Sequence, residues 1–265
     1  MNKSIFLEIC TLIEDKSLYF YGQEKYYSFK SKIISSFDNN QTIDFEKELY
    51  DMLSIIGDEH SFWIKNEKID KYEINDLSIT YINKKLIIKV PFIFFSDDTK
   101  YTNYIKKNNK SLIRFFQKKE VKELFIDLRN NTGGNFWAML AIFGFLFKNK
   151  IVGYFHYKNR NVMWCVNDSY VKNGSYYYQF ETPPSSFNNN YTITVLINEK
   201  TCSSGEALCI AFKSIGARIE GFKSGGYTTG NEEYILSDGS KFYLSECYFM
   251  DSNFNIYKDG INPDN

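Results

Sequence analysis

The sequence lacks the features that mark several classes of protein. Its 32 basic and 32 acidic side chains leave no net charge, which removes the broad positive surface that a nucleic-acid-binding protein needs. The longest apolar run covers residues 137–147, about half of the roughly 20 residues that a membrane-spanning helix needs. We therefore expect neither a nucleic-acid partner nor a membrane span.

Cysteine usage and the first residues indicate a compartment. The five cysteines are odd in number and show no CxxC spacing, which argues against a disulfide framework and against a zinc ribbon. We expect reduced, mostly buried thiols, and neither a metal nor a cofactor. Because residues 1–15 carry no secretory hydrophobic segment and no cleavage site, a cytoplasmic location is expected.

The hydrophobic pattern changes its period along the chain. Apolar side chains recur at helical spacing through residues 1–65, which predicts a small N-terminal helical unit. From Leu77 the period shortens to that of strands. Residues 66–265 are therefore expected to form the core.

Two stretches of this core repeat the order strand, turn, helix. One covers residues 124–147 and turns on a glycine pair, and the other covers residues 191–214 and turns on serines and a glycine. This alternation predicts an α/β fold built of βαβ units with right-handed crossovers. The insert at 153–190, which alternates tyrosine with polar residues, is expected to form an accessory β flap over the core.

The first candidate site is the turn Thr201-Cys-Ser-Ser-Gly-Glu206, which follows a buried strand and opens a helix. A serine hydroxyl there lies at the positive end of the helix dipole, beside backbone N–H groups that lack intrahelical acceptors. A nucleophile and an oxyanion donor would thus come together. The alternative interpretation is an ordinary serine N-cap with glutamate at N3, which is a capping box.

The second candidate is the pair Gly133-Gly134, which follows the strand at 124–128. Consecutive glycines let a backbone N–H approach a ligand oxygen without an intervening Cβ, as a second oxyanion donor requires. In isolation, the same pair is a left-handed turn without a chemical role.

The third candidate is a histidine, of which the chain has two. A serine hydroxyl is a weak nucleophile at its own pKa and needs a neighbouring base. His60 lies in a polar loop beside Asp58 and Glu59, whose carboxylates can orient or charge an imidazole. His156 lies in a strand-like run, where a structural role is expected. His60 is therefore the better candidate for the base.

Five motifs in register resemble the carboxyl-terminal processing (tail-specific) serine peptidases over roughly residues 50–265. They are Leu128-Arg-Asn-Asn-Thr-Gly-Gly, Thr201-Cys-Ser-Ser-Gly-Glu, Gly221-Phe-Lys-Ser-Gly-Gly-Tyr, Leu236-Ser-Asp-Gly-Ser and Gly260-Ile-Asn-Pro-Asp264. The resemblance implies a crotonase-like, ClpP-like spiral of βαβ units. It also implies that the nucleophile stands three residues before Glu206, which selects Ser203 and not Ser204.

One difference from the typical family pattern directs the resemblance to a single branch of the family. Typical members have a Gly-Lys-Gly whose lysine is the general base, but this sequence reads Gly225-Gly226-Tyr227 there. Together with Asp58-Glu-His60-Ser-Phe, this is similar to the nisin resistance protein branch, in which a Ser/His dyad acts. The resemblance therefore implies Ser203 as nucleophile and His60 as base. We find no counterpart of the family's PDZ domain or of that branch's membrane anchor.

The hypothesis that follows is a serine endopeptidase that cleaves short or unstructured peptides, such as lantibiotic-like or ribosomally made peptides or protein tails. The N–H groups of Ser204 and of Gly133 or Gly134 would hold the oxyanion, and tyrosines 176–178 would close over the peptide. Asp58, Glu59 or Glu206 would orient the imidazole. Two alternatives keep the fold: a catalytically silent peptide-binding or immunity module, and a crotonase-type acyl-thioester enzyme. No oligomeric state is predicted.

Overall fold

The computed structural model describes residues 3–65, 75–95, 97–147, 149–174, 176–183 and 190–264. It divides the chain into two compact units. Unit 1 is made of Met1–Lys71, Tyr157–Asn159 and Thr229–Cys247, and unit 2 of Tyr72–His156, Arg160–Thr228 and Tyr248–Asn265. The units therefore do not follow a single cut near residue 65, because two later segments join the N-terminal residues. The predicted boundary at 65/66 itself borders residues 66–74, which lie outside the described residues.

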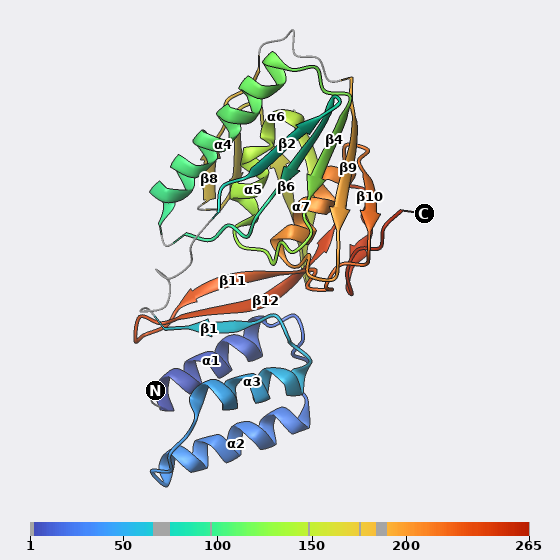
Figure 1. The fold of residues 1–265 in the computed structure, drawn as a ribbon. Helices are drawn as coiled ribbons and strands as arrows, with labels where there is room; N and C mark the ends of the chain where they lie inside the picture. Colours follow the sequence, from blue (N-terminus) through green and yellow to red (C-terminus); the bar gives the residue numbers. More distant parts are fainter. Residues whose placement is uncertain are drawn as a thin grey trace. The chain divides into compact units, whose positions relative to one another are not determined.

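Unit 1 packs three helices against a small antiparallel sheet (Figure 1). α3 begins where Asp44 accepts a hydrogen bond from the N–H of Lys47, and it ends at Gly57 in the left-handed conformation. The apolar faces of the helices share one core with Trp63 and Phe242. Its elements are α1 (Lys3–Lys16), α2 (Glu24–Asp38), α3 (Phe45–Ile56), β1 (Phe62–Ile64), β11 (Thr229–Ile235) and the first residues of β12 (Lys241–Met250).

Unit 2 contains a five-stranded sheet in the order β10-β9-β4-β3-β2. Strands β3, β4, β9 and β10 run parallel, and β2 pairs with β3 as an antiparallel hairpin. The strands are β2 (Ser78–Ile82), β3 (Lys85–Lys89), β4 (Glu123–Asp127), β9 (Thr192–Ile197) and β10 (Arg218–Gly221). The helices that connect them are α4 (Asp98–Lys118), α5 (Phe136–Ile142), α6 (Gly144–Phe147) and α7 (Ser204–Lys213). The α/β prediction and its βαβ order are thus confirmed.

The alternation of side chains along each strand decides which face of this sheet is covered. Leu124 and Ile126 of β4 are fully buried in one core with the apolar faces of α4, α5 and α7. Glu123 and Phe125, which point the other way, are only half-buried. The helices thus pack on this face of the sheet. In open α/β sheets, ligand sites form at the loops that follow the C-terminal ends of the parallel strands.

The predicted flap is a second, antiparallel set of strands in unit 2. It comprises β5 (Lys150–Tyr157), β6 (Asn161–Val166), β7 (Tyr170–Asn173) and β8 (Tyr176–Gln179), and β13 (Ile256–Tyr257) pairs with the end of β12. Tyr178 is buried, and its hydroxyl contacts Asn135 and Asp98. Tyr178 is therefore part of the core and not the tip of a lid. Residues 184–189 of the predicted insert lie outside the described residues.

In the described part of the chain, no helix combines the length and the apolar character needed to cross a bilayer. All five cysteines are free thiols, and Cys10, Cys209 and Cys247 are buried.

We expect Leu112→Ala in α4 to lower the free energy of unfolding by about 2–5 kcal/mol, because Leu112 is fully buried and its removal leaves a cavity. Arg114→Ala, two residues further on the exposed side of the same helix, should change it by less than about 0.5 kcal/mol. Urea denaturation of both variants checks this. Equal effects would contradict the assignment of the buried face of α4.

Candidate active site

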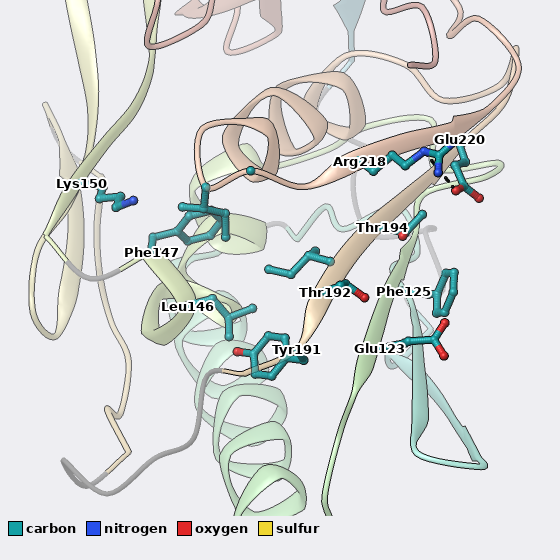
Figure 2. Close-up of a pocket in the computed structure, with 13 residues that line it drawn as sticks. Glu123, Phe125, Leu146, Phe147, Lys150, Tyr191, Thr192, Thr194, Arg218 and Glu220 are labelled. Carbon is teal, nitrogen blue, oxygen red and sulfur yellow. Dashed lines mark ion pairs between the residues drawn. The ribbon is translucent and has the colours of Figure 1, made fainter. Parts of the chain in front are cut away.

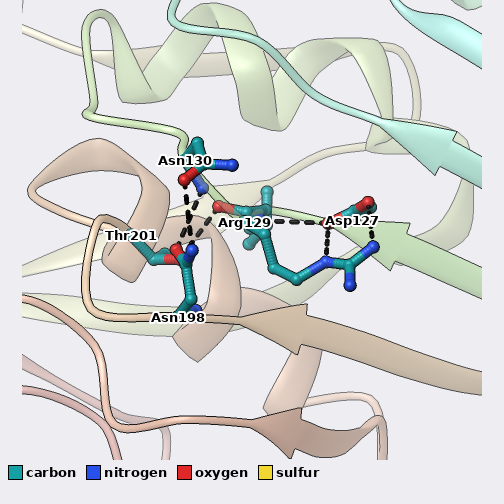
Figure 3. A network of polar contacts seen from close by, with 6 residues as sticks. Asp127, Arg129, Asn130, Asn198 and Thr201 are labelled. Carbon is teal, nitrogen blue, oxygen red and sulfur yellow. Dashed lines mark hydrogen bonds and ion pairs between the residues drawn. The ribbon is translucent and has the colours of Figure 1, made fainter.

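The loops that follow β4 and β9 lie side by side because these two strands are parallel neighbours. Asn130 and Asn198 exchange two hydrogen bonds, from the N–H of Asn130 to Oδ1 of Asn198 and from Nδ2 of Asn198 to Oδ1 of Asn130 (Figure 3). Thr201 Oγ1 donates to the carbonyl of Leu128 at 2.9 Å. These bonds join the predicted serine turn to the predicted glycine loop.

An ion pair supports the start of the same loop. Arg129 contacts Asp127 through Nε and Nη2, each at 2.8 Å (Figure 3). Burial alone would raise the pKa of Asp127, but the hydrogen bonds from Arg129 outweigh it and hold the pKa below its usual value. Asp127 therefore stays ionised at neutral pH.

Ser203 stands at the sharpest point of its turn. Its φ is 53° and its ψ is −120°, and Gly205 N–H donates to the carbonyl of Cys202 at 2.9 Å. These values define a type II′ turn with Ser203 at the position that favours glycine. A side chain held at positive φ is strained, and such strain persists where the surroundings determine the backbone. The turn leaves the Ser203 side chain half-buried, at the N-terminus of α7.

Glu206 holds this turn from within the core. Its Oε2 accepts the N–H of Ser203 at 2.8 Å, and its Oε1 accepts Ser224 Oγ at 2.6 Å and Gly226 N–H at 2.9 Å. Burial raises the pKa of Glu206, and these hydrogen bonds oppose the rise. The bond to Ser203 N–H is one of the two that a capping box requires. The capping-box interpretation thus describes the geometry without excluding a chemical role for Ser203.

The glycine loop lies directly against Ser203. A Cβ added to Gly133 would stand 2.9 Å from Ser203 Cβ, and one added to Gly134 would stand 2.1 Å from the carbonyl oxygen of Ile93. Both glycines have φ above 100°. Ser204 Oγ donates to the carbonyl of Gly134 at 2.6 Å. A side chain at Gly133 would therefore crowd the serine turn, and one at Gly134 would collide with the backbone of Ile93.

Asn131 is a site residue to which the sequence assigned no role. It is fully buried; its Oδ1 accepts Gly133 N–H at 2.9 Å, and its carbonyl accepts Cys202 N–H at 2.9 Å. Its Nδ2 donates to the carbonyls of Val90 and Pro91. One asparagine thus fixes both loops to the end of β3. Asn131 lies inside the Leu128 motif, and this position was the feature of the sequence that could have indicated its role.

His60 lies in unit 1, and three side chains hold it there. Asp58 Oδ1 accepts its backbone N–H at 3.0 Å, Asn231 Nδ2 donates to its carbonyl at 2.9 Å, and Thr229 Oγ1 lies 2.6 Å from its ring Nδ1. Burial lowers the pKa of His60 to about 4. The imidazole is therefore neutral at neutral pH, which is the form that a general base requires.

A buried polar network stands behind His60. Asp58 accepts hydrogen bonds from the N–H and the hydroxyl of Ser61, and Ser245 Oγ lies 2.9 Å from Asn231 Oδ1 and 3.2 Å from Asp58 Oδ1. Burial raises the pKa of Asp58, and the hydrogen bonds from Ser61 oppose the rise. Asp58 thus supports the loop backbone around His60, whereas Glu59 is exposed.

The predicted site residues fall into two groups. Ser203, Ser204, Glu206 and the glycine pair meet within unit 2, whereas His60, Asp58 and Glu59 belong to unit 1. The Ser/His dyad therefore stays a prediction. Glu206 contacts the backbone of Ser203, and the residue at the His60 ring nitrogen is Thr229, which the sequence analysis missed.

A groove of about 850 Å³ lies elsewhere on unit 2 (Figure 2). It is lined by the first residues of β4 and β9, such as Glu123 and Thr192, and by Arg218, which pairs with Glu220. Ser203 follows the opposite, C-terminal end of β9. The groove is therefore not part of the serine site.

Comparison with known proteins decides the family. Residues 95–265 match peptidase family S41. This chain belongs to peptidase family S41. The family membership inferred from the five motifs is thereby confirmed. The nisin-resistance protein of Lactococcus lactis subsp. lactis is 27% identical over 237 residues, which cover 84% of this chain and 69% of that protein.

Solved structures show the same fold as this S41 peptidase. A lipoprotein from Streptococcus agalactiae superposes with a TM-score of 0.76 at 21% identity, covering 98% of this chain and 90% of the other. The photosystem II D1 C-terminal processing protease superposes with a TM-score of 0.59 at 14% identity, covering 98% and 92%. These likenesses confirm the crotonase-like, ClpP-like core with its helical N-terminal part.

In this S41 peptidase, Gly134→Ala should lower the free energy of unfolding more than Gly216→Ala. Both glycines have positive φ, so alanine costs about 1 kcal/mol at either position. Nothing lies within 4 Å of a Cβ on Gly216, whereas one on Gly134 would collide with Ile93. We expect about 1–3 kcal/mol more for Gly134→Ala in urea denaturation. Equal losses would show that the loop can move away from Ile93.

Proposed function

We propose that this S41 peptidase is a serine endopeptidase in which Ser203 is the nucleophile and His60 the general base. The observation that carries the proposal is the strained turn that holds the half-buried Ser203 beside a glycine loop, at the N-terminus of α7. The Ser203 hydroxyl would attack a peptide carbonyl while its proton passes to His60. The imidazolium would then protonate the leaving amine, and water would release the acyl group from Ser203.

The oxyanion would be held by the backbone N–H groups of Ser204 and Gly134. Ser204 is the first residue of α7, so its N–H has no acceptor within the helix. The N–H of Gly133 already donates to Asn131. Gly134 forms a parallel bridge with Ile93, in which its own N–H and carbonyl point away from that residue. Since its carbonyl meets Ser204, Gly134 is the better second donor.

The substrate class follows from the curated relative and not from the site alone. The relative is named for resistance to nisin, and we extend that substrate class to this chain. We propose cleavage of short or unstructured peptides, with lantibiotic-like peptides as the first class to test. The absence of a net charge gives no general attraction for cationic peptides, so local contacts would select the substrate.

Replacing either member of the dyad should abolish cleavage of nisin. We expect Ser203→Ala and His60→Gln each to lower kcat/KM by about 10⁴-fold or more, because the nucleophile and its base act as a unit. Mass spectrometry of nisin incubated with each variant measures the loss. A fluorophosphonate probe should label wild type at Ser203 and fail to label Ser203→Ala.

The chain offers a matched control in its other histidine. His156 Nδ1 contacts Asn161 in the β5–β6 hairpin, and His156→Gln should leave cleavage unchanged. If folded wild type neither reacts with the probe nor cleaves nisin or other peptides, the silent binding module is the correct interpretation. If wild type protects cells from nisin and Ser203→Ala protects equally, the hydrolytic role is wrong.

The low pKa of His60 predicts an unusual acid limb of the pH profile. The base acts when neutral, so kcat/KM should fall as pH drops through about 4. A histidine with the ordinary pKa of about 6.5 would lose activity at a pH about 2.5 units higher. Initial rates on a peptide from about pH 3 to 8, with folding followed by circular dichroism, measure the midpoint. A midpoint near 6.5 would show that the imidazole is not buried in the free enzyme.

A further inference from the structure

The base proposed above has a ring contact that no carboxylate supplies. Thr229 Oγ1 lies 2.6 Å from His60 Nδ1, and Thr229 is buried. The chain's candidates for orienting the ring were Asp58, Glu59 and Glu206. Among these, Asp58 bonds the His60 backbone, and Glu206 bonds Ser203, Ser224 and Gly226.

The strand geometry places Thr229 for this role. Thr229 and Asn231 are two residues apart on β11, so their side chains emerge on the same face. Asn231 holds the His60 carbonyl at 2.9 Å, and Thr229 reaches the ring. One face of β11 therefore fixes both the backbone and the imidazole of His60.

The position of the ring proton, on Nδ1 or on Nε2, decides which nitrogen can act as a base. A neutral imidazole carries one proton, on Nδ1 or on Nε2, and its other nitrogen accepts. A hydroxyl that accepts from Nδ1–H leaves the lone pair on Nε2, whereas a hydroxyl that donates to Nδ1 puts the proton on Nε2. The hydrogen bond at one nitrogen thus sets the function of the other.

We propose that Thr229 is a positioning residue that accepts the Nδ1–H of His60 and so holds the imidazole in the tautomer with its lone pair on Nε2. The inference rests on the proposed role of His60 as base. It adds a third, uncharged member to the dyad, supplied by β11.

The experiment is ¹⁵N NMR of full-length protein labelled at histidine, which shows only two imidazoles because the chain has two histidines. His156 serves as an internal standard, since its Nδ1 lies 2.7 Å from the amide oxygen of Asn161 and therefore carries the proton. The His60→Gln variant assigns the spectrum. Wild-type His60 should show the Nδ1–H form at neutral pH.

Two variants of Thr229 complete the design. Thr229→Val keeps the shape and removes the hydroxyl, and it should shift His60 toward the Nε2–H form and lower kcat by about tenfold or more with little change in KM. Thr229→Ser restores the hydroxyl and should restore both the tautomer and kcat. His156 should not change in either variant.

The outcomes separate this inference from the proposed function. An Nε2–H signal for wild-type His60, or a Thr229→Val spectrum identical to wild type, overturns the role of Thr229 even if the peptidase is active. An Nδ1–H signal that is lost in Thr229→Val and regained in Thr229→Ser supports it even if no substrate has been cleaved. If Thr229→Val does not fold, the wild-type tautomer and the serine variant still decide.

Discussion

The candidate site depends on one buried carboxylate. Glu206 is fully buried, and its carboxylate accepts hydrogen bonds from Ser203 N–H, Ser224 Oγ and Gly226 N–H. A carboxylate is stable away from water only when donors surround it. Its donors come from two separate segments, the turn before α7 and the loop after β10. The same bonds that satisfy Glu206 therefore hold Ser203 in a conformation that a serine would otherwise avoid.

The hydrogen bonds around Glu206 also connect the serine turn with the Gly221 and Gly260 motifs, which lie further along the sequence. Ser224 Oγ donates to Glu206 and accepts the N–H of Ile261 at 2.7 Å, and the Ser224 N–H donates to the carbonyl of Ile261. Asp264 then bonds the N–H of Ile219 at the edge strand β10. The Gly221 and Gly260 motifs thus support the Ser203 turn through backbone and hydroxyl contacts.

The fold class and the serine and glycine turns were predictable because each is local. The strand and glycine pair of one turn, and the strand and serine of the other, can each be recognised from a short stretch of neighbouring residues. The βαβ order then brings the two turns to one edge of the sheet. Asn131 and Thr229 were not predictable in the same way, because their roles are hydrogen bonds to residues 71 and 169 positions away, Cys202 and His60. The buried position of Tyr178 was missed for a related reason. The alternation of tyrosine with polar residues predicts a strand, but it does not show which elements pack over that strand.

With His60 as the proposed base in place of the lysine of typical members, the protein must control more than the charge of the base. A neutral lysine amine carries one lone pair on its single nitrogen, so only its charge decides whether it accepts a proton. Burial of His60 settles the charge, because a pKa lowered to about 4 leaves the ring neutral at neutral pH. Two neutral forms then remain, and only one presents a lone pair on Nε2. A histidine base in this fold therefore needs a partner at Nδ1, and a neutral hydroxyl can supply it without raising the pKa that burial has lowered.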